Sequence, residues 1–356
     1  MPLAVGITYD LKSEYPVRPG DPLDAAAECD PAERIEAVAA ALRAGGMTVR
    51  MIGNVRALLD QRARHGVDLV LNLSEGWRGR NRESEVPIVL EFAGVPYVGS
   101  DATALGAALD KWVAKRLFRS VGIEVPNGFC VARALDDAPW DVLRYPVVVK
   151  PRWEGSGMGM GEESVARDVG ASRRRAQWII ETYQQPALVE EWIDGPEYTV
   201  AVVGPSCEVV MPPVERQRDR PTGLACHLFD ASDYASGCRL LFDTVTLNEA
   251  QTAAVALSAG RACRVLGCCD MARVDIRLDG RGVPHVLEVN PLPSMAPDDT
   301  FGLLGEMIGV GLDGMLAAIV DAAMVRLGIR HVEWTPGVRL SRVVRHRVSL
   351  EHRTGV

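Results

Sequence analysis

The chain has 356 residues and a formal net charge of −8, from 39 Lys and Arg against 47 Asp and Glu. This length predicts two or three domains, and 47% hydrophobic with 24% charged residues excludes disorder as the main state. The acidic balance argues against a nucleic-acid partner held by phosphate neutralisation. The basic residues include only four lysines, Lys12, Lys111, Lys115 and Lys150. Biased codon use explains the arginine excess most simply, and a retained lysine then marks a position where arginine would not serve.

Neither a targeting segment nor a membrane span is expected. The N-terminus has no basic stretch before its short apolar run. The longest apolar helical stretch, Met307–Leu327, is interrupted by Asp313 and Asp321, which favours an amphipathic helix over a membrane span. Eight cysteines without C-x-x-C spacing favour free thiols in a reducing compartment. We therefore expect a cytoplasmic protein without a membrane partner.

The first hundred residues alternate between strand and helix patterns. Short apolar runs predict strands at Leu3–Thr8, Thr48–Ile52 and Asp68–Leu73. A helix through Ala44, with Asp30 as its N-cap and Pro31 as its first residue, separates the first two. A second helix is expected near Val55–His65. This alternation predicts a parallel sheet, with ligands beyond the carboxyl ends of its strands.

The remaining chain is expected to contain further strands and helices around one long irregular segment. Helices are expected at 102–121 and Asn248–Leu266, and strands at Val125–Ala132, Tyr145–Lys150, Ala187–Glu191, Glu197–Val203 and Glu208–Met211. The polar stretch Pro212–Gly237 is too long for an ordinary connection and predicts a lid. Residues after Trp334 are interpreted as a surface extension.

Residues 272–291 alternate strictly on both sides of Asp279-Gly280, which predicts a β-hairpin. A turn symmetric about residues 280 and 281 places Arg273 opposite Glu288. One predicted face holds Arg273, Asp275, Arg277, Val286, Glu288 and Asn290, and the other holds Val274, Ile276, Leu278, Val283, Leu287 and Val289. Two carboxylates and an amide oxygen suit Mg²⁺. An ordinary hairpin with a solvated charged face is the alternative.

A second candidate site follows the predicted strand that ends at Lys150. Four glycines at alternate positions from Gly155 to Gly161 allow backbone N–H groups to approach phosphates. The spacing is neither a Walker A motif nor a complete Rossmann fingerprint. By itself this segment, like the acidic cluster that begins at Glu190, is equally consistent with a structural turn.

Taken together and in this order, the segments resemble the ATP-grasp superfamily and, within it, the D-alanine–D-alanine ligases. The matching motifs are Leu90–Ser100, Asp110-Lys111 with Lys115, Val149-Lys150-Pro151 with Glu154-Gly155-Ser156, Glu190-Glu191-Trp192-Ile193 with Glu197, and Arg273-Val274-Asp275 with Glu288-Val289-Asn290-Pro291. The likeness spans about Leu69 to Met295.

The resemblance implies an α/β (α+β) ATP-grasp fold with three domains. These are an N-terminal α/β domain over 1–104, a central subdomain with the glycine-rich loop over 105–188, and a C-terminal subdomain over 189–334, with an Arg- and His-rich extension over 335–356. In this family, a carboxylate attacks the γ-phosphate of ATP, and an amine then displaces phosphate from the acylphosphate. The implied partners are a small carboxylate donor and an amine acceptor, and a homodimer is left open.

The resemblance also implies cofactors and roles for individual residues. ATP would bind with two Mg²⁺ ions, and Mn²⁺ is an alternative ion. The implied nucleotide contacts are Lys111, Lys150, Glu154, Gly155 and Ser156 at the phosphates, Glu190, Glu191, Trp192 and Ile193 at adenine, and Glu197 at the ribose. The implied metal ligands are Asp275, Glu288 and Asn290. Arg273 and a backbone N–H near Ser294 would stabilise the tetrahedral oxyanion.

The substrate positions depart from the family pattern. Glu14 is the candidate for the glutamate that holds the first substrate's amine. Arg80 and Arg82 lie in the loop that replaces the family's His-Gly motif, where a donor pocket and a solvated loop are equal alternatives. The lid segment around Tyr234 lacks the family's lysine. Asp298 and Asp299 stand where the family binds a carboxylate, which two aspartates would repel.

Three functions follow. The first is an ATP-dependent carboxylate–amine ligase with an altered acceptor in specialised biosynthesis. The second is an authentic but divergent D-alanine–D-alanine ligase in cell-wall precursor synthesis. The third is a nucleotide-binding protein without turnover.

Overall fold

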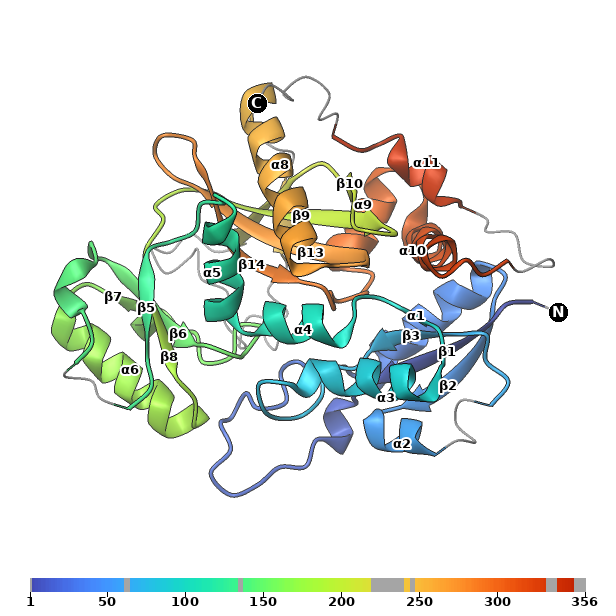
Figure 1. The fold of residues 1–356 in the computed structure, drawn as a ribbon, viewed down its shortest axis with the longest axis horizontal. Helices are drawn as coiled ribbons and strands as arrows, with labels where there is room; N and C mark the ends of the chain where they lie inside the picture. The colour runs from blue at the N-terminus through green and yellow to red at the C-terminus, as the bar shows by residue number, and fades with distance from the viewer. Residues whose placement is uncertain are drawn as a thin grey trace.

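The computed structural model describes residues 2–60, 65–133, 137–218, 240–243, 247–330 and 338–348. They form three sheets flanked by helices (Figure 1). The strands are β1 Ala4–Tyr9, β2 Thr48–Gly53, β3 Leu69–Leu73, β4 Tyr97–Val98, β5 Gly128–Val131, β6 Val147–Pro151, β7 Val165–Ala166, β8 Ala187–Glu191, β9 Glu197–Gly204, β10 Val209–Val210, β11 Val214–Arg218, β12 Leu240–Asp243, β13 Asp270–Leu278 and β14 Pro284–Asn290. The helices are α1 Ala32–Ala44, α2 Val55–Leu59, α3 Glu85–Ala93, α4 Ala102–Leu109, α5 Lys111–Ser120, α6 Val169–Tyr183, α8 Glu249–Leu266, α9 Thr300–Met307, α10 Gly311–Leu327 and α11 Leu340–Val344.

The N-terminal sheet has the order β2-β1-β3-β4 and all of its pairs are parallel, as the sequence predicts. Two local expectations for its helices are wrong. The N-cap of α1 is Pro31 rather than Asp30, and Asp30 instead forms an ion pair with Arg34 at 3.0 Å. Helix α2 ends at Leu59, short of the expected His65. Because the strands are parallel, their carboxyl ends meet at one edge of the sheet.

A second sheet, in the order β5-β8-β6-β7, is antiparallel. Helix α6 packs on it through Ala176 and Ile179. In the same core cluster the Phe129 and Trp140 rings pack edge to face, with centroids 5.2 Å apart. Strand β8 spans residues 187–191, so the domain boundary proposed after residue 188 falls inside a strand.

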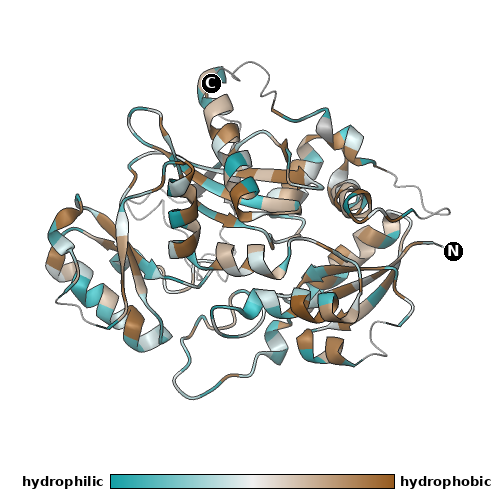
Figure 2. Cartoon of the chain, in the orientation of Figure 1, coloured by the Kyte–Doolittle hydropathy of each residue, from teal (hydrophilic) through white to brown (hydrophobic). Residues whose placement is uncertain are grey.

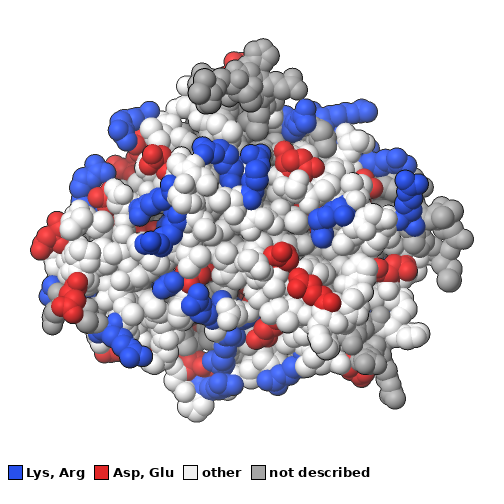
Figure 3. All heavy atoms as spheres, in the orientation of Figure 1, with Lys and Arg blue, Asp and Glu red and all other residues white. Residues whose placement is uncertain are grey.

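The largest sheet has the order β12-β11-β9-β13-β14, with β10 paired to β9. Helix α8 and residues of α4 and α5 pack on one face around Val274 and Val286. Helix α10 packs against the sheet on one side and α1 on the other, so one core joins it to the N-terminal sheet. Figure 2 shows the apolar residues gathered along the strands and the helix sides that face them. On the face in Figure 3, basic and acidic side chains are interspersed.

The predicted hairpin is present as β13 and β14, but its predicted register is wrong. Arg273 pairs with Asn290, and Asp275 lies opposite Glu288. A bulge follows, because Ile276 pairs with Val286 and leaves Leu287 as an extra residue on β14. Val286 therefore packs in the core, and Leu287 faces a cavity, which reverses their predicted faces.

Three further expectations concern the second half of the chain. The proposed lid contains strand β11 where irregular structure was expected, and residues 219–239, with Tyr234, lie outside the described residues. The long apolar helix begins at Gly311 and follows the separate helix α9. No single described helix is long and apolar enough to cross a membrane, although α9 and α10 together meet the length and composition with a 107° bend between them.

Candidate functional site

Two adjoining cavities lie between the sheets. The first is bounded by β6, β8, the hairpin and the loop after β6. The second lies between the N-terminal sheet and the end of β14. Both are lined by Lys111, Gly155, Ser156, Arg273 and Glu288. A ligand in one cavity would therefore adjoin a ligand in the other.

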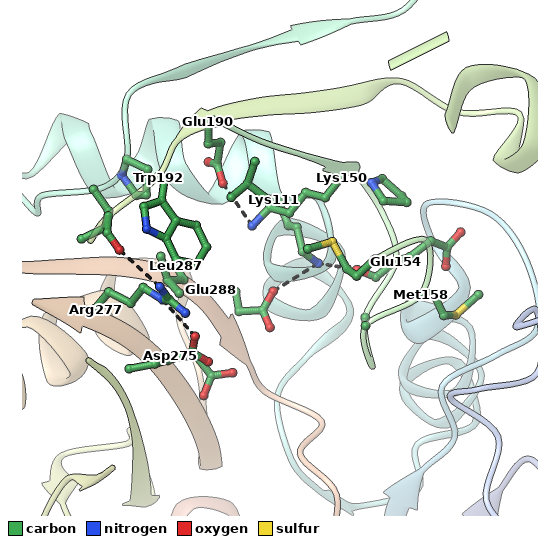
Figure 4. A pocket seen from close by; sticks show the side chains of 18 of the residues that line it. Lys111, Lys150, Glu154, Met158, Glu190, Trp192, Asp275, Arg277, Leu287 and Glu288 are labelled. Carbon is green, nitrogen blue, oxygen red and sulfur yellow. Dashed lines mark hydrogen bonds and ion pairs between the residues drawn. The ribbon is translucent and has the colours of Figure 1, made fainter. Parts of the chain in front are cut away.

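Buried charges form one wall of the first cavity (Figure 4). The carboxylate of Glu190 forms ion pairs with Lys115 at 2.8 Å and with Lys150 at 3.0 Å. Burial lowers the pKa of the Lys115 ammonium to about 8, although Glu190 opposes this shift. For Glu190 itself, burial raises the pKa, but the two ammonium groups lower it below its usual range. This carboxylate is thus ionised and fixed in place.

The opposite wall is formed by a stacked arginine. The Arg277 guanidinium lies 4.2 Å from the centre of the Trp192 ring. Its Nε donates to Glu197 Oε2 at 3.0 Å and its Nη1 donates to the Ile193 carbonyl at 3.2 Å. Figure 4 shows the Arg277 and Trp192 side chains next to each other in the cavity wall. The wall therefore offers a flat surface beside a carboxylate.

The segment between these walls presents backbone rather than side chain. The Glu191 carboxylate points away, where it accepts hydrogen bonds from the Arg144 amide at 2.9 Å and Asn127 Nδ2 at 3.2 Å. The Glu191 and Trp192 amides donate to the carbonyls of Asn127 and Pro146. Of these three residues, Ile193 keeps its N–H for a ligand.

The hairpin brings its acidic residues to the junction of the cavities. Asp275 and Glu288 pair across the ladder, and Asn290 Nδ2 lies 3.4 Å from Asp275 Oδ2. Arg273 contacts Asp275 at 3.1 Å and Lys111 contacts Glu288 at 3.3 Å. Burial raises the pKa of Glu288, but Lys111, Lys150 and Arg273 lower it well below its usual range. The group is a set of hard oxygen ligands, with Glu288 held ionised, beside fixed cations.

Carboxylates from the N-terminal loop hold the glycine-rich loop. The Gly155 N–H donates to Glu28 Oε1 and the Gly159 N–H donates to Asp24 Oδ2, both at 2.8 Å. Tyr183 also donates to Asp24, at 2.7 Å. Gly157 and Gly159 have φ angles of +70° and +67°, which favour glycine. The loop therefore presents N–H groups to anions, and two of them already meet carboxylates.

The Arg82 side chain is buried next to this contact. It donates to the Trp153 carbonyl at 2.7 Å, forms an ion pair with Glu28 and lies 3.4 Å from Glu154. Arg80 is 52% exposed and contacts Asp110 at 3.2 Å. Arg82 thus tethers two loops instead of presenting its guanidinium to a substrate, and neither arginine lines the two cavities.

The structure separates the other candidate substrate residues. Asp299 lines the second cavity, and its carboxylate caps α9 through the Thr300 N–H at 2.6 Å. Ser294 lines the same cavity. Asp298 is exposed, and Glu14 lies outside both cavities, where Asn54 Nδ2 donates to it at 3.2 Å.

Sequence reasoning missed a role for three residues. Lys115 was noted only as part of a helical motif, although its spacing of four from Lys111 places both on one side of α5. Asp24 and Glu28 reach the glycine-rich loop from more than 120 positions away, and no local pattern signals such a contact.

The sequence is similar to those of known proteins over most of its length. The family model for the D-ala D-ala ligase C-terminus matches residues 117–321. A D-alanine–D-alanine ligase from Stutzerimonas stutzeri is 30% identical over 289 residues, which cover 81% of this chain and 88% of that protein. An uncharacterized protein from Sinorhizobium fredii is 34% identical over 259 residues, which cover 72% of this chain and 74% of that protein.

A solved structure shares the fold. The D-alanine–D-alanine ligase from Bacillus anthracis, crystallised in complex with ATP, matches with a TM-score of 0.72 and 20% identity. The match covers 92% of this chain and 99% of that one. The expected ATP-grasp fold is confirmed, and the chain belongs to the D-alanine–D-alanine ligase family of ATP-dependent C–N ligases.

Proposed function

We propose that this protein joins a small carboxylic acid to an amine at the expense of ATP, through an acylphosphate. The observation that carries the proposal is the junction of two cavities at Lys111, Glu288, Arg273 and the glycine-rich loop. A phosphate at this junction lies within reach of both a nucleotide in the first cavity and an acid in the second. Phosphoryl transfer to an acid requires this adjacency of the nucleotide and the acid, together with cations that stabilise the phosphate charge.

The first cavity suits ATP. Adenine would lie against the Arg277–Trp192 stack, with Glu190 and the Ile193 N–H at its polar edge. Glu197 would accept from the ribose hydroxyls, and Lys111 and Lys150 would contact the phosphates. The glycine-rich loop would add its N–H groups, including that of Gly155, which a phosphate could take from Glu28. A relative crystallised with ATP supports this assignment.

Asp275, Glu288 and Asn290 fit Mg²⁺ in ligand type, because all three supply hard oxygens and Glu288 is held ionised. Two bound ions would supply neutralisation of phosphate charge during transfer. Arg273 and Lys111 lie beside these ligands and hold positive charge at the same place. Arg273 and the backbone N–H near Ser294 would stabilise the oxyanion that forms when the amine attacks.

The reaction balances in two steps. A carboxylate oxygen of the donor attacks the γ-phosphorus, and ADP leaves with the electrons of the broken P–O bond. The neutral amine of the acceptor then attacks the acyl carbon, phosphate leaves, and the extra proton on nitrogen is lost. The products are an amide, ADP and phosphate.

We propose further that the acceptor differs from a plain D-amino acid. Asp299 supports this, because its carboxylate already fills the N-terminus of α9 and faces the second cavity. A free acceptor carboxylate would meet this negative charge. The alternative, an authentic D-alanine–D-alanine ligase, is supported by the named function of the relatives.

One experiment tests both the ligase activity and the altered acceptor. The full-length protein is incubated with ATP, Mg²⁺ and a matrix of amino acids and amines, ADP release is followed, and products are identified by mass. Glu288→Gln serves as the inactive control, and Glu33→Gln, on the exposed side of α1, as the matched active control. We expect amide formation from at least one pair and poor D-alanyl-D-alanine formation. Efficient D-alanyl-D-alanine formation would overturn the altered acceptor, and no ADP release from any pair would overturn the ligase proposal.

A further inference from the structure

Two carboxylates in the second cavity have no partner among the residues that the structure describes. Glu75 and Glu83 come from the loop after β3 and both line the cavity. Glu83 is only 7% exposed. Within the described ranges, neither carboxylate has a hydrogen-bond or ion-pair partner. Glu75 is half-buried. Buried carboxylates are normally paired, so the two residues, and Glu83 above all, need an explanation.

The remaining acids of the cavity are already matched. Asp30 pairs with Arg34 at 3.0 Å, Glu288 with Lys111 at 3.3 Å and Glu28 with Arg82. Asp299 caps α9. Lys12 lines the cavity but is exposed at its rim. The carboxyls of this cavity that have no partner among the described residues are therefore Glu75 and Glu83.

The loop geometry holds these two residues together. Gly76 has φ +71°, and its N–H donates to Asp10 Oδ2 at 2.9 Å. A Cβ added to Gly76 would lie 2.7 Å from the Arg82 carbonyl oxygen, so residues 76 and 82 are in backbone contact. Glu75 and Glu83 follow directly on either side of this contact. The nearby Arg82 cannot serve both, since it already binds Glu28, Glu154 and the Trp153 carbonyl.

Burial makes ionisation of the two carboxyls unfavourable in the empty protein. It raises the pKa of both, and Glu83 raises that of Glu75 further, while Glu28 and Glu154 raise that of Glu83, to about 7. Arg82 lowers both values and Lys111 lowers that of Glu83, without abolishing the shift. A packed hydrophobic or amide side chain at either position would avoid this cost.

We propose that Glu75 and Glu83 form a subsite for a basic group of the substrate, a guanidinium or a second ammonium that takes no part in the reaction. A guanidinium binds two carboxylates through its planar set of N–H donors. A diamine supplies one ammonium for recognition and another for reaction. A neutral side chain would leave both carboxyls without a counter-charge. The inference rests on the proposed ligase function, because it assigns the substrate class of the same site.

Binding of matched probes tests the subsite directly. Isothermal titration compares arginine with its neutral isostere citrulline, in both enantiomers, and 1,4-diaminobutane with 1,4-butanediol. Each titration uses the full-length protein with Mg²⁺ and a non-hydrolysable ATP analogue. We expect at least one cationic probe to bind about tenfold more tightly than its neutral partner, or better. We expect Glu83→Gln and Glu75→Gln to remove this preference, while Glu33→Gln retains it. The proposal is overturned if the cationic and neutral probes of both pairs bind equally or if neither cation binds. It is also overturned if both variants keep the preference for the cation.

Thermal unfolding gives a second test, in which the variant that binds the cation less well should be more stable. A carboxylate that serves a ligand destabilises the empty protein, so Glu83→Gln should raise the melting temperature of the empty protein. A purely structural carboxylate would lower the melting temperature when replaced, and that result would also overturn the subsite. ADP release separates the two proposals. Equal turnover of arginine and citrulline would refute the subsite and keep the ligase, whereas a binding preference without any turnover would keep the subsite and refute the ligase.

Discussion

Glu190 provides the sharpest test of the buried charges in the first cavity. It carries one negative charge between the ammonium groups of Lys115 and Lys150, at 2.8 and 3.0 Å. Glu190→Gln leaves two buried cations without their shared counter-charge. Loss of one partner from a buried ion pair typically costs about 3–5 kcal/mol. The cost has a ceiling, because a lysine of ordinary pKa can lose its proton at pH 7 for about 4.6 kcal/mol.

The expected result is a fall in melting temperature on the order of 10 °C for a cooperative unit of 150–250 residues. Lys115→Met should cost much less, because it removes the excess cation and leaves a balanced Lys150–Glu190 pair. Glu162→Gln, an exposed acid in the loop before β7, is the matched control and should change little. Thermal unfolding of the four proteins at equal concentration gives the comparison.

The pH dependence of stability shows whether the loss in Glu190→Gln comes from the unpaired lysines. The pKa of Lys115 is about 8 in the folded chain and 10.5 ordinarily, so the unfolded chain binds more protons between these values. Stability from this group therefore rises with pH across that window. Without Glu190 the folded pKa falls further, and the window extends downward. The deficit of Glu190→Gln should then shrink from pH 7 to pH 9 by up to about 1.4 kcal/mol per pH unit. A normal melting temperature, or a deficit independent of pH, would refute this account.

Three further predictions address other contacts. Arg277→Leu should raise the KM for ATP about tenfold with little change in kcat, because it removes the stack on Trp192 and the contact with Glu197. A loss confined to kcat in steady-state assays would contradict this prediction. Glu28→Gln should lower the melting temperature, because Arg82 loses a buried partner. It should also lower the KM for ATP, because the Gly155 N–H becomes free for phosphate. An increased KM for ATP would show that Glu28 and phosphate do not compete for this N–H. Gly195→Ala should destabilise the chain by more than about 2 kcal/mol, because a Cβ there would overlap the Leu278 carbonyl oxygen; denaturant unfolding with Gly280→Ala, where a Cβ meets open space, is the control.

The hairpin shows how much of a structure the alternation of polar and apolar residues can predict. Its two strands and its charged face were predictable, because polar and apolar residues alternate along both. The bulge at Leu287 was not, since one extra residue reverses the faces beyond it without changing the local pattern. The bulge nevertheless helps to form the site, because it places Glu288 opposite Asp275 and turns Leu287 toward the first cavity.

Elements with strong local signals were predicted closely. Strand β8 has the expected limits, and α8 begins after Asn248 with a capping box to Gln251. The contacts that assemble the site have no such signals. Glu28 meets Gly155 across 127 positions, and Arg82, next to Glu83 in the chain, pairs with Glu28 instead. Such features depend on how three sheets pack, which periodicity does not encode.

This packing explains why three of the four lysines are present in a chain that otherwise uses arginine. Three of the four lysines, Lys111, Lys115 and Lys150, are buried or nearly so around the first cavity, each in contact with a carboxylate. Two of them share the single carboxylate of Glu190, from opposite sides and within 3.0 Å. Two planar guanidinium groups would need more space and would not leave one ammonium free to turn toward phosphate. Lys115 differs from the other two, since it is 2% exposed and the first cavity does not reach it. Its ammonium therefore acts through Glu190, which it holds in position for the lysine that faces the ligand.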